Sequence, residues 1–175
     1  MKSTLQKLST TNFTETADNI ISAYNNQWHC VVNFIYFSQI VSQHVFSSAK
    51  KKTEKEKEYK KLILKSDFLL PDGIALQVFY YLAATFRAIK TDKKWIPNVN
   101  WTDFTPYFLN NTKQKYWSQR INILLYWSKP SIVEKVKDTL SLKGYNIIYI
   151  QDWFSEFDWQ KAEEALNEYV DTTNI

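Results

Sequence analysis

One acidic side chain stands where proteins often carry out acid–base or phosphate chemistry. Asp72 follows an apolar run that ends at Leu70, within the turn Pro71-Asp72-Gly73, and an apolar helical pattern comes next. A carboxylate at such a strand-to-helix junction can act as a general base, and the helix N-terminus behind Gly73 can receive a phosphate. The alternative is a plain turn, because Pro presets φ and Gly permits a left-handed backbone.

Four further polar residues are candidates for a binding site. Asn33 interrupts an apolar strand, so its amide needs a partner, which is either a ligand or a neighbouring loop. Thr102 and Asp103 predict a helix start, with Thr102 as the N-cap. Gln151 follows another apolar strand and is either a ligand contact or an ordinary polar loop residue.

The sequence carries no metal or cofactor signature. His29 and His44 are the only histidines and lack partners at metal-ligand spacing, while the single Cys30 excludes a cysteine-based zinc site or a disulfide framework. A glycine-rich dinucleotide fingerprint, a Walker lysine motif and a serine nucleophile elbow are also absent. We therefore expect neither a metal nor a cofactor.

These residues would be positioned by alternating strands and helices. Short β-branched and aromatic runs predict strands over 30–36, 67–70, 121–126 and 145–150, and a weak strand and turn over 3–13. Apolar spacing of three and four predicts helices over 14–25, from 38 into the charged stretch near 63, and over 74–90, 102–109, 131–142 and 158–169. This alternation predicts an α/β fold with a parallel sheet covered on both faces, in a single domain over 1–175. Ligands of such sheets bind beyond the carboxyl ends of the strands.

Composition and charge narrow the class of protein. Of 175 residues, 45% are apolar and 23% charged, which is globular composition. No apolar run approaches the ~18 residues of a membrane span, and the start lacks a signal-peptide pattern, so we expect a cytoplasmic chain, soluble or peripheral. The net charge of +4 permits contact with phosphate or anionic lipid. The lysines over 50–61 alternate with glutamates, which is typical of a solvated helix face, and we expect no nucleic-acid partner.

Several segments together resemble the WecG/TagA/CpsF glycosyltransferases. Residues 69–74 (LLPDGI) resemble the family's LPDG turn, and residues 30–37 its first core strand with an Asn. Residues 99–106 (VNWTDFTP), 124–130 (LLYWSKP) and 145–154 resemble three later landmarks, in the right order. The resemblance covers about residues 12–170.

This resemblance implies a Rossmann-like three-layer sandwich and a metal-independent transferase. Such an enzyme moves N-acetylmannosamine or a related sugar from a UDP donor to a polyprenyl-diphosphate-linked acceptor, with inversion, in cell-wall or surface-polysaccharide synthesis. By resemblance Asp72 is the base, Asn33, Gly73 and Thr102 line the pocket, Asp103 orients its segment and Gln151 lies near the nucleotide. Peripheral contact with the inner face of the cell membrane and a homo-oligomer are compatible with it.

The chain also departs from the family. Val31 and Asn98 stand where the family has Thr and Arg, and the family's C-terminal part has no counterpart. The alternatives are therefore a truncated, inactive Rossmann-like module that binds a nucleotide or a partner, and an unrelated doubly wound domain.

Tryptophan and glycine counts are unusual. Gly occurs twice and Trp seven times, and Trp101, Trp127 and Trp153 stand at family glycine positions. Trp28, Trp95 and Trp117 also fall in predicted turns, where a left-handed backbone disfavours Trp. We hypothesise that these six are glycines in the living cell, through a code that reads UGA as Gly. The alternative is a divergent protein whose tryptophans pack on its surface or core.

Overall fold

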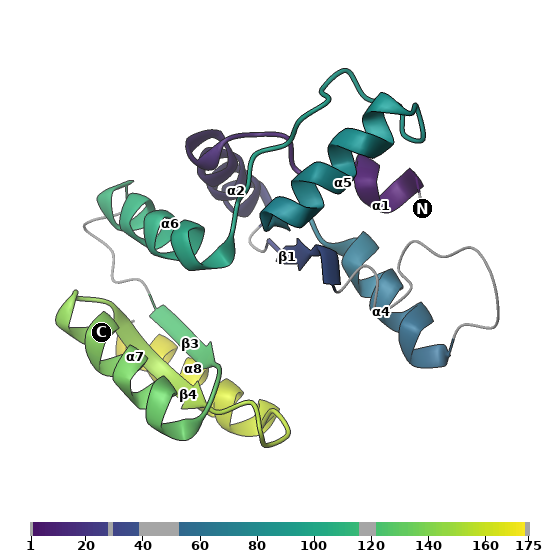
Figure 1. Ribbon diagram of the computed structural model, residues 1–175. Coiled ribbons are helices and arrows are strands. Elements are labelled where there is room, and N and C mark those ends of the chain that lie inside the picture. The colour runs from purple at the N-terminus through teal and green to yellow at the C-terminus, as the bar shows by residue number, and fades with distance from the viewer. Residues whose placement is uncertain (1, 28–29, 39–52, 116–121, 174–175) are drawn as a thin grey trace. The chain divides into compact units, whose positions relative to one another are not determined.

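The computed structural model in Figure 1 describes residues 2–27, 30–38, 53–115 and 122–173. The fold is mixed α/β, with two small parallel sheets of two strands each among the described residues. The chain forms two compact units, Met1–Thr112 and Lys113–Ile175, and each is described by itself. The single domain expected over residues 1–175 stays a prediction.

The first unit is built around the parallel pair of β1 and β2. In chain order it contains α1 (Lys2–Gln6), α2 (Phe13–Gln27), β1 (Val32–Tyr36), α4 (Glu54–Lys65), β2 (Phe68–Asp72), α5 (Ile74–Thr85) and most of α6 (Trp101–Lys115). Val32 pairs with Phe68 and Tyr36 with Asp72, so both strands end at the same edge. The parallel pairing predicted from the sequence is confirmed here.

Both faces of this pair are covered, as expected for a parallel sheet. Leu69 and Leu70 follow each other in β2 and are each fully buried, on opposite faces. Leu69 belongs to a core with side chains of α1, α4 and α5, and Leu70 to a second core with side chains of α2 and α6. The alternation of side chains along one strand therefore joins two helical layers.

The second unit repeats the strand–helix–strand arrangement on a smaller scale. It contains β3 (Asn122–Tyr126), α7 (Pro130–Leu142), β4 (Asn146–Gln151) and α8 (Trp159–Thr173). β3 and β4 are parallel, with Tyr126 opposite Gln151. Figure 1 shows α7 in front of this pair and α8 behind it, and both helices contact β4. Gly144, with a φ of +79°, ends α7 as predicted from the sequence.

Some element boundaries differ from the sequence predictions. Residues 2–6 are helical rather than a weak strand, because Leu5 buries its side chain in the first core, although Leu8 does form an isolated bridge to Leu69. α5 ends at Thr85 instead of 90, since Arg87 takes a left-handed φ of 56°. The helix predicted from residue 38 lies partly outside the described residues, and α4 begins at a capping box of Thr53 with Glu56.

Within the described ranges, none of the helices combines the length and the apolar character that a bilayer span requires.

Candidate active site around Asp72

Asp72 is the last residue of β2, at the carboxyl edge of the first parallel pair. It lies opposite Tyr36 of β1 and directly follows Pro71, which is buried. The sequence therefore places the carboxylate where ligands of parallel sheets bind. Its side chain is half-buried, in contrast to an ordinary surface turn.

Gly73 turns the chain from β2 into α5. Its φ of 91° and ψ of 147° are open to Gly and strained for any L side chain, although an added Cβ would meet nothing within 4 Å. The Gly73 N–H donates to Asn98 Oδ1 at 2.7 Å. This bond fixes the peptide that directly follows Asp72.

Three hydrogen bonds hold the segment over residues 96–99 beside β2 and α5. Besides the bond to Asn98, the Val99 N–H donates to the Pro71 carbonyl oxygen at 2.8 Å, and Gln77 Nε2 donates to the Ile96 carbonyl oxygen at 2.7 Å. The Gln77 bond is buried. The segment leads straight into α6, so these bonds set where that helix begins.

The N-cap of α6 is Asn100, and the prediction that Thr102 caps this helix is wrong. Asn100 Oδ1 accepts from the Asp103 N–H at 2.9 Å and from the Thr102 hydroxyl at 2.6 Å. Asn100 Nδ2 donates to Asp103 Oδ2 at 2.8 Å. Asn100 is the cap because its backbone carbonyl oxygen accepts the first hydrogen bond of the helix, from the Phe104 N–H. Thr102 therefore lies inside the first turn.

The electrostatic setting of Asp72 combines burial with one backbone donor. Burial raises the pKa of the Asp72 carboxyl above its usual range, and the Trp101 backbone N–H, which donates to it, partly offsets that rise. Trp101 is the first residue of α6. Asp72 thus lies between the start of α5 and the start of α6, and the positive dipole end of each helix favours an anion.

Asn33 lies away from this edge. It pairs with Leu69, three positions before the Tyr36–Asp72 pair, and its Nδ2 donates to Ser66 Oγ at 2.6 Å. Ser66 in turn donates to the Ile63 carbonyl oxygen at 2.9 Å. Of the two alternatives for the Asn33 amide, the structure contains the loop partner, just after α4.

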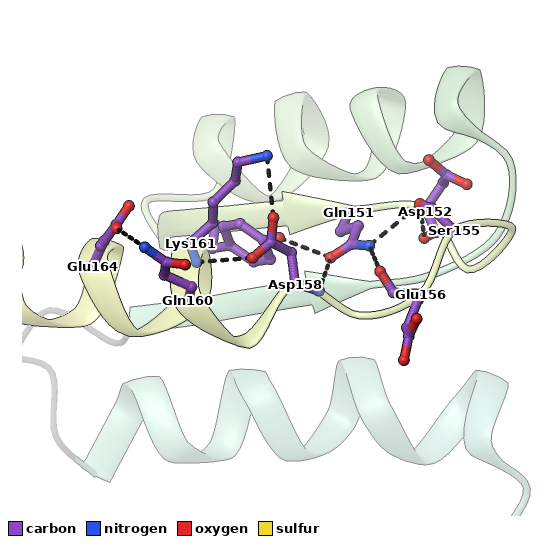
Figure 2. Close-up of polar contacts among 9 residues, drawn as sticks. Gln151, Asp152, Ser155, Glu156, Asp158, Gln160, Lys161 and Glu164 are labelled. Carbon is purple, nitrogen blue, oxygen red and sulfur yellow. Dashed lines mark hydrogen bonds and ion pairs between the residues drawn. The ribbon is translucent and has the colours of Figure 1, made fainter.

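Gln151 ends β4 in the second unit, and its amide organises the following loop, as Figure 2 shows. Its Oε1 accepts from the Tyr149 hydroxyl at 2.7 Å and from the Asp158 N–H at 2.9 Å. Its Nε2 donates to Ser155 Oγ at 3.2 Å and to the Glu156 carbonyl oxygen at 2.6 Å. The amide therefore has partners on both of its polar atoms.

A cavity of about 430 Å³ lies beside Gln151, between α7 and the loop after β4. Four carboxylates and one ammonium line it: Glu134, Asp152, Glu156, Asp158 and Lys161. Lys161 holds the pKa of Asp158 below its usual range, first through its backbone N–H and then through its side chain. The acidic excess favours a neutral or cationic group over a phosphate.

The hypothesis that six tryptophans are glycines in the cell rests on turns with a left-handed backbone, and none of the described tryptophans has a positive φ. Within the described residues, the non-glycine positions with positive φ are Arg87 and Ser128. Ser128 directly follows Trp127, whose N–H donates to the Gln151 carbonyl oxygen at 3.0 Å. The Trp153 N–H donates to the Ser128 carbonyl oxygen at 3.3 Å. Trp28 and Trp117 lie outside the described residues.

Two residues of this arrangement were missed by sequence analysis. Asn98 holds the turn at Gly73 from 25 residues away, so no local pattern marks it. Asn100 holds the start of α6 and is of a residue type that commonly caps helices, but the sequence pattern predicts Thr102 as the cap. Throughout the described ranges, no group of three or more His, Cys, Asp and Glu side chains is placed to hold a metal ion. The site is therefore a carboxylate between two helix N-termini, kept in place by asparagine amides.

No family model matches the chain, and no curated protein matches it.

Proposed function

We propose that the chain is a UDP-sugar-dependent glycosyltransferase of the WecG/TagA/CpsF type, with Asp72 as its general base. The donor sugar is N-acetylmannosamine or a relative, and the acceptor is a sugar on a polyprenyl diphosphate at the cytoplasmic face of the membrane. The Rossmann-like three-layer sandwich belongs to this proposal. The covered parallel pair in the first unit is in keeping with it.

The observation that carries the proposal is the setting of Asp72. A half-buried carboxylate at a strand end, with a raised pKa and two helix N-termini beside it, suits base catalysis next to a diphosphate. An ordinary surface turn would leave Asp72 solvated, with no reason to be held by the segment at 96–99. That segment is bonded at three points, to β2, to Gly73 and to α5.

The proposed reaction is a single inverting displacement. Asp72 accepts the proton of an acceptor hydroxyl as that oxygen forms a bond to the anomeric carbon of the donor sugar. The bond from this carbon to the UDP oxygen breaks, and UDP leaves with the electron pair. Burial makes the Asp72 carboxylate a stronger base than a solvated one, and the N–H groups at the helix starts favour the charge of the leaving diphosphate.

The other residues carry smaller parts of this proposal. The contact of Asp103 with Asn100 supports its role in orienting the start of α6. Thr102 lies in the same first turn, exposed, where it could reach a ligand. Asn33 and Gln151 keep their assigned roles as predictions, since their amides are bound to protein groups.

The test is a transfer assay with the UDP-sugar and a lipid-diphosphate-linked acceptor, alongside a calorimetric titration with UDP. Asp72→Asn should lower turnover roughly 10²- to 10⁴-fold while UDP still binds. Asp138→Asn, at an exposed carboxylate of α7, is the matched control and should keep full turnover. Equal turnover of the parent and Asp72→Asn proteins would remove the proposed base.

The inactive, nucleotide- or partner-binding module remains the second candidate. It is favoured by the indoles at positions 101, 127 and 153, where the family has glycine, and by the lack of a family match. The triple variant Trp101→Gly/Trp127→Gly/Trp153→Gly separates the two. Turnover that rises in this variant supports the transferase and the glycine hypothesis, whereas UDP binding without turnover in both proteins supports the module.

A further inference from the structure

Helix α5 carries an apolar face that the first unit does not cover. The helix contains no charged residue, and Leu76, Gln77 and Tyr80 turn one side of it into the protein. The opposite side and the first residue after the helix remain exposed, with Phe86 at 78% and Ile74 at 68%. The exposed apolar set is Ile74, Val78, Tyr81, Leu82 and Phe86. A helix that is apolar all round is ordinarily buried on all sides, so this face calls for a partner.

Positive charge follows this apolar face immediately in the chain. Four exposed or half-exposed cations come within eight residues of Phe86, with one acid among them: Arg87, Lys90, Lys93 and Lys94, with Asp92. Trp95 is also exposed, and its ring lies 6.1 Å from that of Tyr81 on α5. The cations therefore adjoin aromatic and aliphatic surface.

The loop that carries these cations is tied to the protein. The Tyr80 hydroxyl donates to Thr91 Oγ1 at 3.0 Å, and Thr91 accepts from the Lys93 N–H at 3.2 Å. Lys93 Nζ donates to the Thr10 carbonyl oxygen at 3.2 Å. Arg87 closes the helix, with its N–H on the Ala84 carbonyl oxygen at 3.1 Å. The apolar face and the cations thus form one fixed surface, called the α5 surface below.

We propose that the α5 surface docks on a membrane rich in anionic lipid. Leu, Phe and Tyr or Trp side chains next to Lys and Arg are the combination that lies in the interface of such a membrane, where each cation gains from the surface potential. The 12-residue α5 is about 18 Å long, too short for the ~30 Å hydrocarbon core, so it would lie in the membrane plane. A two-fold contact with a second copy would bring the same cations toward each other, which disfavours that occupant.

Membrane docking of the α5 surface deepens the proposed function. It rests on that function for one point only, namely that docking brings Asp72 to a lipid-linked acceptor. α5 begins one residue after Gly73, so its exposed face starts beside Asp72 and ends at the cations. A docked α5 would hold Asp72 at the depth of lipid headgroups. The diphosphate of a lipid-linked acceptor lies at that depth.

The experiment is flotation of the full chain with vesicles. We expect binding to vesicles of phosphatidylglycerol and phosphatidylcholine, little binding to phosphatidylcholine alone, and loss of binding at high salt. Lys90→Gln/Lys94→Gln should weaken partitioning roughly 30-fold, from about a fivefold effect of each cation near such a surface. Lys61→Gln/Lys65→Gln, exposed cations of α4, is the matched control and should bind as the parent does.

A second pair of variants tests the apolar part. Leu82→Gln/Phe86→Ser should weaken partitioning at least about tenfold, and Leu62→Gln/Leu142→Ser, at apolar residues that are also exposed, should not. All four side chains are solvent-facing, so circular dichroism should be unchanged. The proposal is overturned if anionic vesicles do not bind the chain, or if both test pairs bind like the parent. A parent dimer that Leu82→Gln/Phe86→Ser dissociates, without vesicle binding, would assign the face to self-association. UDP titration in solution is independent of this result, so either proposal can fail alone.

Discussion

Replacing Asn98 by Ala tests whether the turn at Asp72 is held by a single amide. Asn98 Oδ1 accepts the Gly73 N–H at 2.7 Å in a partly buried setting, 25 residues away in the chain. The Asn98→Ala variant leaves that N–H without its acceptor, at a backbone with a φ of 91°. Because the cost is that of an unpaired, partly buried donor, we expect a loss of about 1–3 kcal/mol in the free energy of unfolding.

The assay is urea unfolding followed by circular dichroism, with Asn98→Asp as the conservative companion. An Asp carboxylate keeps an acceptor at the same position, so this variant should recover most of the lost stability. It also places a second negative charge near Asp72, which should raise the pKa of Asp72 further and move the acid limb of the activity profile to higher pH. An acid limb that stays in place in this variant would contradict Asp72 as the group that titrates there.

One result would refute this reasoning. If Asn98→Ala lowers the free energy of unfolding by less than about 0.5 kcal/mol, the bond does not hold the turn, since surface substitutions commonly fall in that range. Asn110→Ala, at an exposed position of α6, supplies the reference for a surface change in the same unit.

Three further predictions follow from the same structure. Burial raises the pKa of Asp72 in the folded chain, so the contribution of this carboxyl to stability is greatest below its usual pKa range and falls as pH rises through the pKa of the folded state. Asp72→Asn should therefore be more stable than the parent at neutral pH. In a pH series of urea melts, this difference in the free energy of unfolding should vanish in acid. In the same melts, Gly144→Ala should lower the free energy of unfolding by about 1–2 kcal/mol and Arg87→Gly should raise it by about 0.5–1 kcal/mol, because both residues end a helix with positive φ. A more stable Gly144→Ala or a less stable Arg87→Gly would contradict the strain argument. Leu70→Ala should cost about 2–5 kcal/mol and Leu142→Ala under about 0.5 kcal/mol, given full burial of the first and 90% exposure of the second; similar melting temperatures for the two variants would count against the second core.

Repeating local patterns predicted most of the elements. The strands β1, β2, β3 and β4 lie within about two residues of their predicted ranges, because each is an apolar run bounded by polar or turn residues. The helices α2 and α7 were equally plain from their three-and-four spacing. The sequence pattern did not predict α1, because this helix is five residues long and depends on tertiary contacts that bury Leu5 and Thr4.

In the candidate site, too, the sequence predicted the residues with a local pattern and not those that act through distant contacts. Asp72 and Gly73 were predicted because a Pro-Asp-Gly turn after a strand has a local signature. Asn98 acts through a bond to Gly73, and a side chain that reaches across 25 residues has no such signature. Asn100 acts over three residues, through the bond that its Oδ1 accepts from the Asp103 N–H. The choice between Thr102 and Asn100 as the cap of α6 depended on which residue first leaves helical geometry, which the side-chain types alone do not decide.

The two parallel pairs differ in how far apart along the chain their partners stand. Val32 of β1 must find Phe68, and β2 in turn accepts backbone bonds from Ser9 and Val99, whereas Asn122 of β3 meets Asn146 across a single helix. The entropy of closing a loop grows with its length, and distant partners slow the search for native pairs. We therefore expect the second unit to pair its strands first, and the register of β2, which gathers partners from both ends of the first unit, to be settled later.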